Sequence, residues 1–276
     1  LIANALGKVA DNIFSLPVND LTMPLAWIGI LAYALQIFFD FSGYSDMAIG
    51  LGRMFGFRFY ENFNYPYIAT SLREFWRRWH ISLSKWFRDY IYIPLGGNRV
   101  SVKRVYLNLI TVFFLTGIWH GASLNFIVWG MFHGFFLTCE HFGFSKILER
   151  LWKPFQHLYL LLVTIISWVF FRVDTLTGAT SYLFAMVNID NWSTSKFQYA
   201  QVLTYEFFYV FVIAMIFSMP LFPWFKLKLT VVSQNSLLGI LFLISFPRII
   251  ILTLLLMFSL MRVASSTYNP FIYFRF

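Results

Sequence analysis

Apolar stretches of about 20 residues recur along the chain, separated by short polar segments. A helix needs roughly 20 such residues to cross a hydrocarbon core about 30 Å thick, so the pattern predicts about five or six membrane-spanning helices. The run between Arg104 and Glu140 holds no formally charged residue. As one helix it would be about 53 Å long, so we predict two short spans that meet near "WHGAS". The other spans are expected at residues 23–39, 155–171, 202–222 and 237–261.

Two of these regions contain residues that disturb a helix. The segment "DFSGYSDMAIGLGRMFGF" follows the first span, and its Gly43, Gly50 and Gly52 predict a second helix that is weakened or closely packed. In the last span, Pro247 and Arg248 predict a kink or a buried polar site.

Composition places the chain among integral membrane proteins. Hydrophobic residues make up 59% and charged residues only 12%, with a mean hydropathy of +0.67, whereas about a quarter of the residues in soluble domains are charged. We therefore predict an all-α, multi-pass transmembrane bundle with interfacial and re-entrant helices, in one domain over residues 1–276. The single cysteine, Cys139, excludes an intrachain disulfide and is read as apolar filler. No cleavable signal peptide is recognised, and we expect the C-terminal part of a longer protein.

The net charge of +9 comes from basic residues between apolar spans, without a motif for nucleic-acid binding. Residues 73–104 include eight basic residues and only two acidic ones, Glu74 and Asp89, and this excess of positive charge predicts a cytoplasmic location for the stretch. Alternation along the chain then places residues 173–200 outside. The remaining inside positions are Lys146, Arg150, Lys153, Lys226 and Lys228.

The basic stretch is also amphipathic. Projected as one helix over residues 73–90, its aromatic and leucine side chains fall on one face and its charged side chains on the other. Four arginines prevent it from crossing the bilayer, so residues 72–99 are predicted to lie at the cytoplasmic membrane surface, with "YIPLGGNR" as a turn. The apolar face consists of Phe75, Trp76, Trp79, Leu83, Trp86, Phe87 and Tyr90.

Two histidines carry the candidate chemistry. His120 lies within an apolar stretch, where burial favours the neutral imidazole, and a neutral imidazole is a competent general base. His80 lies at the edge of the aromatic face, near Trp76 and Phe87, where it can face a cavity. Both readings compete with purely structural roles in packing and at the interface. His133, His141 and His157 are weaker candidates because their surroundings are less polar.

Other chemistries find less support. No HExxH or CxxC spacing predicts a metal, and no GxSxG predicts a serine nucleophile. Asp40 and Asp46 flank "FSGYS" and are expected to form an ion pair or cap, or alternatively to line a polar cavity. An embedded histidine also suits a proton-coupled transporter, but no inverted repeat is found.

At these residues the chain resembles the membrane-bound O-acyltransferase family and, within it, the bacterial alginate O-acetyltransferase-like branch. The matching segments are "QIFFDFSGYSDMAIGLGRMFGFRFYENFNYPY", "REFWRRWHISLSKWFRDYIYIPLGGNR", "TGIWHGASLNFIVWGMFHG" and "NPFIYFRF".

The resemblance implies that His120 is the catalytic residue and His80 the second active-site histidine. It implies transfer of an acyl group, with acetyl expected, from a cytoplasmic donor such as acetyl-CoA or an acyl carrier, to hydroxyls of an exported polysaccharide. D-alanylation of teichoic acid is the alternative within acyl transfer. The expected location is the bacterial inner membrane, with lipid and with periplasmic or carrier proteins as partners, and no bound cofactor. Family members are nearly twice as long. Candidate substrate-binding residues are Asp40, Ser42, Tyr44, Asp46, Arg73, Trp76, Arg77, Trp79, Trp119 and Asn125.

Overall fold

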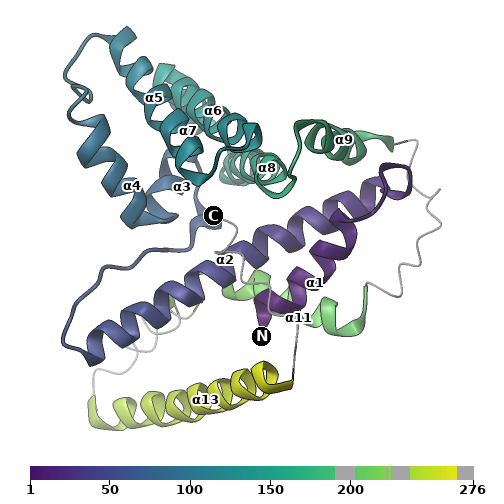
Figure 1. Ribbon diagram of the computed structural model, residues 1–276. Helices are drawn as coiled ribbons and strands as arrows, with labels where there is room; N and C mark the ends of the chain where they lie inside the picture. Colours follow the sequence, from purple (N-terminus) through teal and green to yellow (C-terminus); the bar gives the residue numbers. More distant parts are fainter. Residues whose placement is uncertain (190–202, 222, 225–236, 266–276) are drawn as a thin grey trace.

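Helices make up every regular element of the described chain in the computed structural model (Figure 1), which confirms the all-α prediction. The structure describes residues 1–189, 203–221, 223–224 and 237–265. Lys226, Lys228 and the terminal "NPFIYFRF" therefore lie outside the described residues. The α-helices are α1 (Ile2–Phe14), α2 (Met23–Met54), α3 (Leu72–Arg78), α4 (Ile81–Phe87), α5 (Val102–His120), α6 (Leu124–Cys139), α7 (Ser145–Arg150), α8 (Lys153–Arg172), α9 (Leu176–Val187), α11 (Tyr205–Phe217) and α13 (Leu237–Ser265).

Four helices of the described chain are long and apolar enough to cross a membrane: α2, α5, α8 and residues Pro247–Ser265 of α13. The break predicted near "WHGAS" is confirmed, because α5 ends at His120 and α6 begins at Leu124. Of these two helices, α5 is long enough to cross a membrane, whereas α6, with 16 residues, falls short of the predicted span. The prediction of a full span at 202–222 is wrong, because α11 has only 13 residues. Pro247 lies inside α13 without ending it, and Arg248 is exposed rather than in a buried polar site.

The prediction of a second helix after residue 39 is wrong, because α2 continues unbroken for 32 residues. Its length is about 48 Å at the rise of an α-helix. A Cβ at Gly43 or Gly50 would meet no atom within 4 Å, so neither glycine serves close packing. Of the three glycines named in the prediction, only Gly52 is closely approached, by the ring of Phe59.

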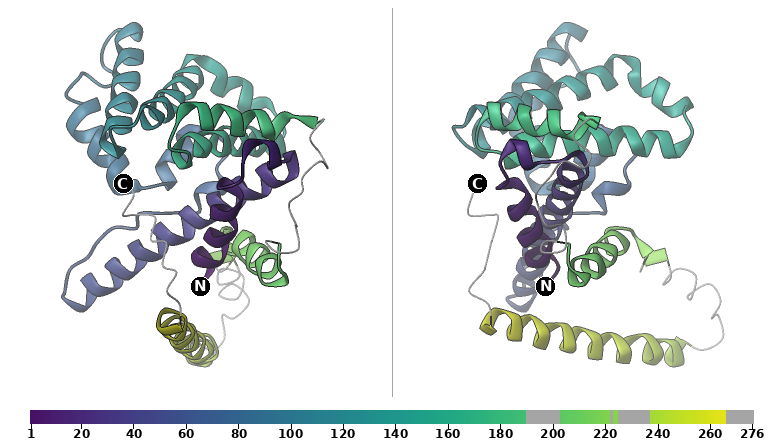
Figure 2. Two further views of the ribbon diagram at one scale, coloured as in Figure 1. Left: turned by 45° about the vertical axis from the view of Figure 1, so that its right-hand side comes forward. Right: turned by 90° about the vertical axis from the view of Figure 1, so that its right-hand side faces the viewer.

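Helix α2 crosses the molecule diagonally and separates α1 and α11 from the upper group of α5, α6 and α8 (Figures 1 and 2). Near the start of α2, Arg172 at the end of α8 forms a 2.6 Å ion pair with Asp11 of α1. The same guanidinium lies 5.1 Å from the ring centre of Phe14. Helix α13 lies below the other helices in the views and is joined to α11 by a 2.8 Å ion pair between Arg262 and Glu206.

Close backbone contact joins α5 to α6. A Cβ at Gly117 would lie 2.5 Å from the carbonyl oxygen of Phe126, and one at Gly130 would overlap the carbonyl oxygen of Phe113. Small residues at facing positions let membrane helices approach closely. This contact fixes how the end of α5, with His120, sits against α6.

The single amphipathic helix predicted over residues 73–90 is wrong. The chain breaks between α3 and α4 at His80, whose φ of 42° and ψ of 57° are left-handed. Phe75, Trp79 and Phe87 are buried in the protein core, whereas Trp86 and Tyr90 are exposed. Most of the apolar face that was predicted to contact lipid thus packs against protein. The turn predicted at "YIPLGGNR" is confirmed, with Gly96 and Gly97 at positive φ.

The break at His80 is held by main-chain contacts with residues 62–64. The N–H of Ile81 donates to the carbonyl of Asn62 at 2.9 Å, and the N–H of Asn64 donates to the carbonyl of Arg78 at 2.9 Å. These long-range bonds replace the helical ones that a continuous helix would have made. They explain why local periodicity failed here.

Candidate active site

His120 is the last residue of α5 and is buried, with 9% of its surface exposed. Its ring meets Trp129 of α6 edge-on, with ring centres 4.9 Å apart, and Phe171 of α8 at 5.1 Å. Gly121 follows at a φ of 152° and ends the helix. The imidazole therefore sits where α5, α6 and α8 meet, in an aromatic environment that favours its neutral form.

His80 is buried to the same degree, and its ring meets Phe41 of α2 at 4.7 Å. Its Nδ1 lies 3.3 Å from Oδ1 of Asn62. Because an amide oxygen only accepts, Nδ1 carries the hydrogen and Nε2 keeps its lone pair. Burial lowers the pKa of His80 to about 4, so this ring is neutral near pH 7.

Trp119 lies between the two histidines. Its ring centre is 4.8 Å from that of His120 and 6.4 Å from that of His80, and 51% of its surface is exposed. The fold thus brings together two residues that are 40 positions apart, beside an indole open to the surroundings. The predicted neighbours of His80, Trp76 and Phe87, are replaced by Phe41 and Trp119, because the chain breaks at His80.

A cavity of about 440 Å³ opens between α3, α4 and α5. Cations, namely Arg73, Arg77, Lys85 and Arg88, contribute to its wall. The wall also includes the rings of Trp76 and Phe113, together with Thr116, which lies one helical turn before His120. Neither His80 nor His120 lines this cavity, which ends short of both imidazoles.

The predicted substrate-binding residues divide by location. Arg73, Trp76 and Arg77 line the cavity. Trp79 is packed in the core, and Asn125 is buried with its amide donating to the carbonyl of Val173.

The four predicted residues on α2 do not line the cavity. Asp40 and Ser42 are half-buried, whereas Tyr44 and Asp46 are exposed. The ion pair expected for Asp46 is absent among the described residues.

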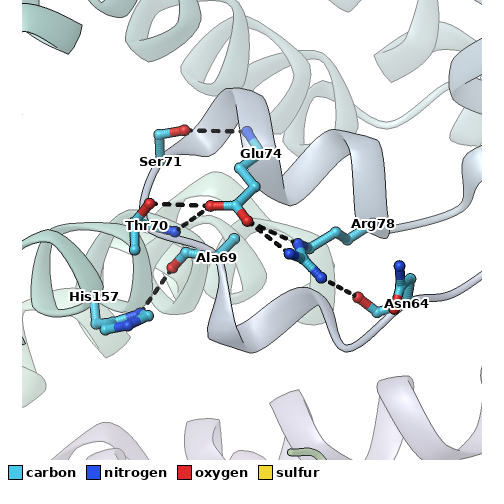
Figure 3. A network of polar contacts seen from close by, with 7 residues as sticks. All are labelled: Asn64, Ala69, Thr70, Ser71, Glu74, Arg78 and His157. Carbon is cyan, nitrogen blue, oxygen red and sulfur yellow. Dashed lines mark hydrogen bonds and ion pairs between the residues drawn. The ribbon is translucent and has the colours of Figure 1, made fainter. Parts of the chain in front are cut away.

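Helix α3, which carries much of the cavity wall, is anchored at its first turn (Figure 3). Ser71 Oγ accepts from the N–H of Glu74, and a carboxylate oxygen of Glu74 accepts from the N–H of Thr70 at 2.8 Å. The other oxygen pairs with Arg78 at 2.8 Å. Burial raises the pKa of Glu74, but these hydrogen bonds outweigh it and hold the pKa below its ordinary value. Nearby, His157 Nδ1 donates to the carbonyl of Ala69 at 3.0 Å.

Asn62 and Glu140 were not recognised from the sequence. Asn62 Oδ1 also accepts from the N–H of Ser82 at 3.0 Å and from its hydroxyl at 2.9 Å. Glu140 is 1% exposed and accepts from the N–H groups of Leu72 and Arg73 at 2.6 and 3.0 Å. The sequence did offer one signal for Glu140, because this acid ends a long run without charged residues.

Comparison with known proteins identifies the family of the chain. Residues 1–171 match the MBOAT, membrane-bound O-acyltransferase family. The chain belongs to this family.

Its relatives carry several acyl-transfer names. The chain is 40% identical to a protein described as a probable alginate O-acetylase from Azotobacter vinelandii, over 100% of this chain and 59% of the relative. It is 42% identical to a peptidoglycan O-acetyltransferase of Helicobacter pylori, over 70% of this chain and 37% of the relative. It is 35% identical to a teichoic acid D-alanyltransferase of Bacillus subtilis, over 50% of this chain and 37% of the relative. The chain thus spans about three fifths of the first relative's length.

Proposed function

We propose that the protein is an O-acyltransferase of the bacterial inner membrane. It moves an acyl group, acetyl in the first instance, from a cytoplasmic donor to hydroxyl groups of an exported cell-surface polysaccharide. The observation that carries this proposal is the pair of buried histidines beside Trp119, in a chain of the MBOAT family.

In the proposed reaction His120 acts as general base. Its neutral ring accepts the proton of an acceptor hydroxyl while that oxygen attacks the acyl carbonyl carbon. Positioned general bases contribute typically about 10²- to 10⁴-fold to rate. The exposed indole of Trp119 offers the acceptor a surface next to both rings.

His80 has a supporting role in this scheme. Asn62 holds Nδ1–H, so the unprotonated Nε2 accepts a hydrogen bond from the acceptor hydroxyl or from the donor. A neutral His80 also adds no positive charge that would oppose proton uptake by His120.

The donor enters through the cavity between α3, α4 and α5. Guanidinium and ammonium groups around it suit a phosphate-bearing donor, whether a nucleotide thioester or an acidic carrier protein. The same cations also suit anionic lipid headgroups at the cytoplasmic surface. The positive-inside pattern of residues 73–104 supports a cytoplasmic opening for this cavity.

The test compares ester groups on surface polysaccharide from cells that produce the full natural protein, its His120→Ala variant or no protein. Mild base releases the acyl groups, and mass spectrometry identifies them. We expect acetate from the wild type and background levels from His120→Ala. The matched control is His141→Ala, because His141 is exposed and remote from this site.

Each outcome has a distinct meaning. Alanine in place of acetate assigns the D-alanyl reaction named for the Bacillus relative. Unchanged ester content without the protein overturns the proposal of an acyltransferase. Wild-type ester content in His120→Ala overturns the role of His120.

A further inference from the structure

Three aromatic rings contact one another at the inner wall of the cavity, and one of them, Trp76, is part of its lining. Trp76 of α3, Trp129 of α6 and His133 of α6 form a cluster, here called the three-ring cluster. The ring centre of His133 is 5.1 Å from that of Trp76 and 5.0 Å from that of Trp129, and the two indoles are 5.9 Å apart. All the contacts are edge-on or strongly inclined.

The protonation of His133 is set by its neighbours. The hydroxyl of Ser167 donates to the carbonyl of Thr164 at 2.7 Å, and its oxygen lies 3.0 Å from Nε2 of His133. Because that hydroxyl hydrogen is already used, Nε2 carries the hydrogen and donates to Ser167. Nδ1 of His133 is therefore an acceptor.

Each ring of the cluster presents one buried polar nitrogen that has no hydrogen-bond partner among the described residues: Nε1 of Trp76, Nε1 of Trp129 and Nδ1 of His133. Trp129 is 1% exposed and His133 is fully buried. Buried polar groups in proteins are almost always paired. Two unpaired donors and one unpaired acceptor on three rings in mutual contact suit the binding of a polar group.

The cluster also connects the two parts of the site. Trp76 and Phe113 line the cavity, and both rings contact His133. On the other side, Trp129 meets the ring of His120. Through these ring contacts the three-ring cluster lies between the lining of the cavity and His120.

We propose that the three-ring cluster binds the thioester end of the acyl donor. The indole N–H groups of Trp76 and Trp129 donate to the acyl carbonyl oxygen. Nδ1 of His133 accepts from an amide N–H in the donor arm, close to the sulfur. This proposal rests on the proposed function and names the donor as an amide-bearing thioester.

The proposed transfer passes through a tetrahedral intermediate. The acceptor oxygen attacks the carbonyl carbon as its proton passes to His120, and the carbonyl electron pair moves to oxygen. The two indole N–H groups stabilise this oxyanion. When the carbonyl re-forms, the carbon–sulfur bond breaks, and the departing thiolate takes the proton from His120. The products are the O-acyl ester and a thiol.

The first test uses Trp76→Phe and Trp129→Phe in the full natural protein, with a small N-acetylcysteamine thioester as donor. Both changes remove an N–H group and keep an aromatic ring. Loss of one oxyanion donor lowers kcat by about 10²- to 10³-fold in a known case. We expect a fall of at least tenfold for each variant, with little change in KM. Trp168→Phe is the control, because it removes the N–H group of another buried indole whose ring contacts Trp79 and stacks on Trp129 but does not line the cavity.

A second test separates the role of His133 from simple packing. The donor is compared with an analogue in which an ester oxygen replaces the amide N–H. A site built to pair a polar group rejects the analogue that lacks it. We expect the wild type to prefer the amide donor by about tenfold in kcat/KM, and His133→Phe to lose this preference.

A third measurement needs no variant. The carbonyl stretch of an isotopically labelled ketone analogue of the donor is recorded while it is bound to the wild type. Two hydrogen bonds lower this frequency below its value in an apolar solvent, and an unshifted band overturns the proposal. Equal kcat values for the three Trp→Phe variants, or no amide preference in the wild type, also overturn it. A wild type without any acyl transfer would instead reject the proposed function.

Discussion

The placement of His80 depends on one amide side chain, and Asn62→Ala removes it. The variant loses hydrogen bonds to Ser82 at 2.9 and 3.0 Å and the contact of 3.3 Å with Nδ1 of His80. Two well-formed hydrogen bonds contribute together about 2 kcal/mol. A left-handed conformation costs a non-glycine residue about 1–2 kcal/mol, so the strain at His80 would no longer be offset.

A shift of about 2 kcal/mol changes an equilibrium about 30-fold. We therefore expect Asn62→Ala to lower kcat for acyl transfer by about 10- to 30-fold while the protein remains folded in the membrane. Steady-state transfer of labelled acetyl from donor to acceptor measures this change. The matched control is Asn64→Ala, because Asn64 pairs with Arg78 through main-chain atoms that alanine keeps. Equal kcat values for the two variants would refute the anchoring role of Asn62.

Three further predictions concern the scaffold and its response to pH. Gly130→Ala places a methyl group against the carbonyl of Phe113 and is expected to lower the free energy of unfolding by about 1–3 kcal/mol. Gly43→Ala, on an open helix surface, should raise it by up to about 1 kcal/mol. Equal unfolding midpoints of the two variants in detergent would contradict this prediction. Glu140→Gln removes one of the two carboxylate oxygens that accept from the first turn of α3, so the free energy of unfolding should fall by about 1–3 kcal/mol and hydrogen exchange at residues 72–78 should become faster. Glu149→Gln, at an exposed position, should change neither quantity. Burial lowers the pKa of His80 to about 4, so the unfolded chain binds a proton that the folded chain does not. Stability should accordingly fall by up to about 3 kcal/mol as the pH drops from about 6.5 to about 4, and a His80→Gln variant should show a smaller loss.

Much of the fold followed from the length of the apolar runs. The break between α5 and α6 was predictable because a charge-free run of that length exceeds one membrane crossing. The continuity of α2 was not, because an isolated glycine lowers helix propensity by only about 1 kcal/mol and does not by itself end a helix. The length of α11 was also missed, since hydropathy extends past the point where the helix ends.

The site was only partly predictable for a similar reason. His80 and His120 stood out as histidines in unusual surroundings, but their meeting beside Trp119 depends on the left-handed turn at His80. That turn is held by Asn62, which lies 18 positions away along the chain. Local periodicity contains no information about such long-range bonds, so it placed Trp79 at a lipid surface when the residue is in the core.

The central claim is that His120 removes the proton from the acceptor hydroxyl. The most direct measurement is the single-turnover rate of acyl transfer from bound donor to acceptor, compared between the wild type and His120→Ala, with donor binding measured separately. We predict that His120→Ala binds the donor with unchanged affinity and transfers its acyl group about 10²- to 10⁴-fold more slowly. A His120→Ala variant that transfers the acyl group at the wild-type rate would contradict the account.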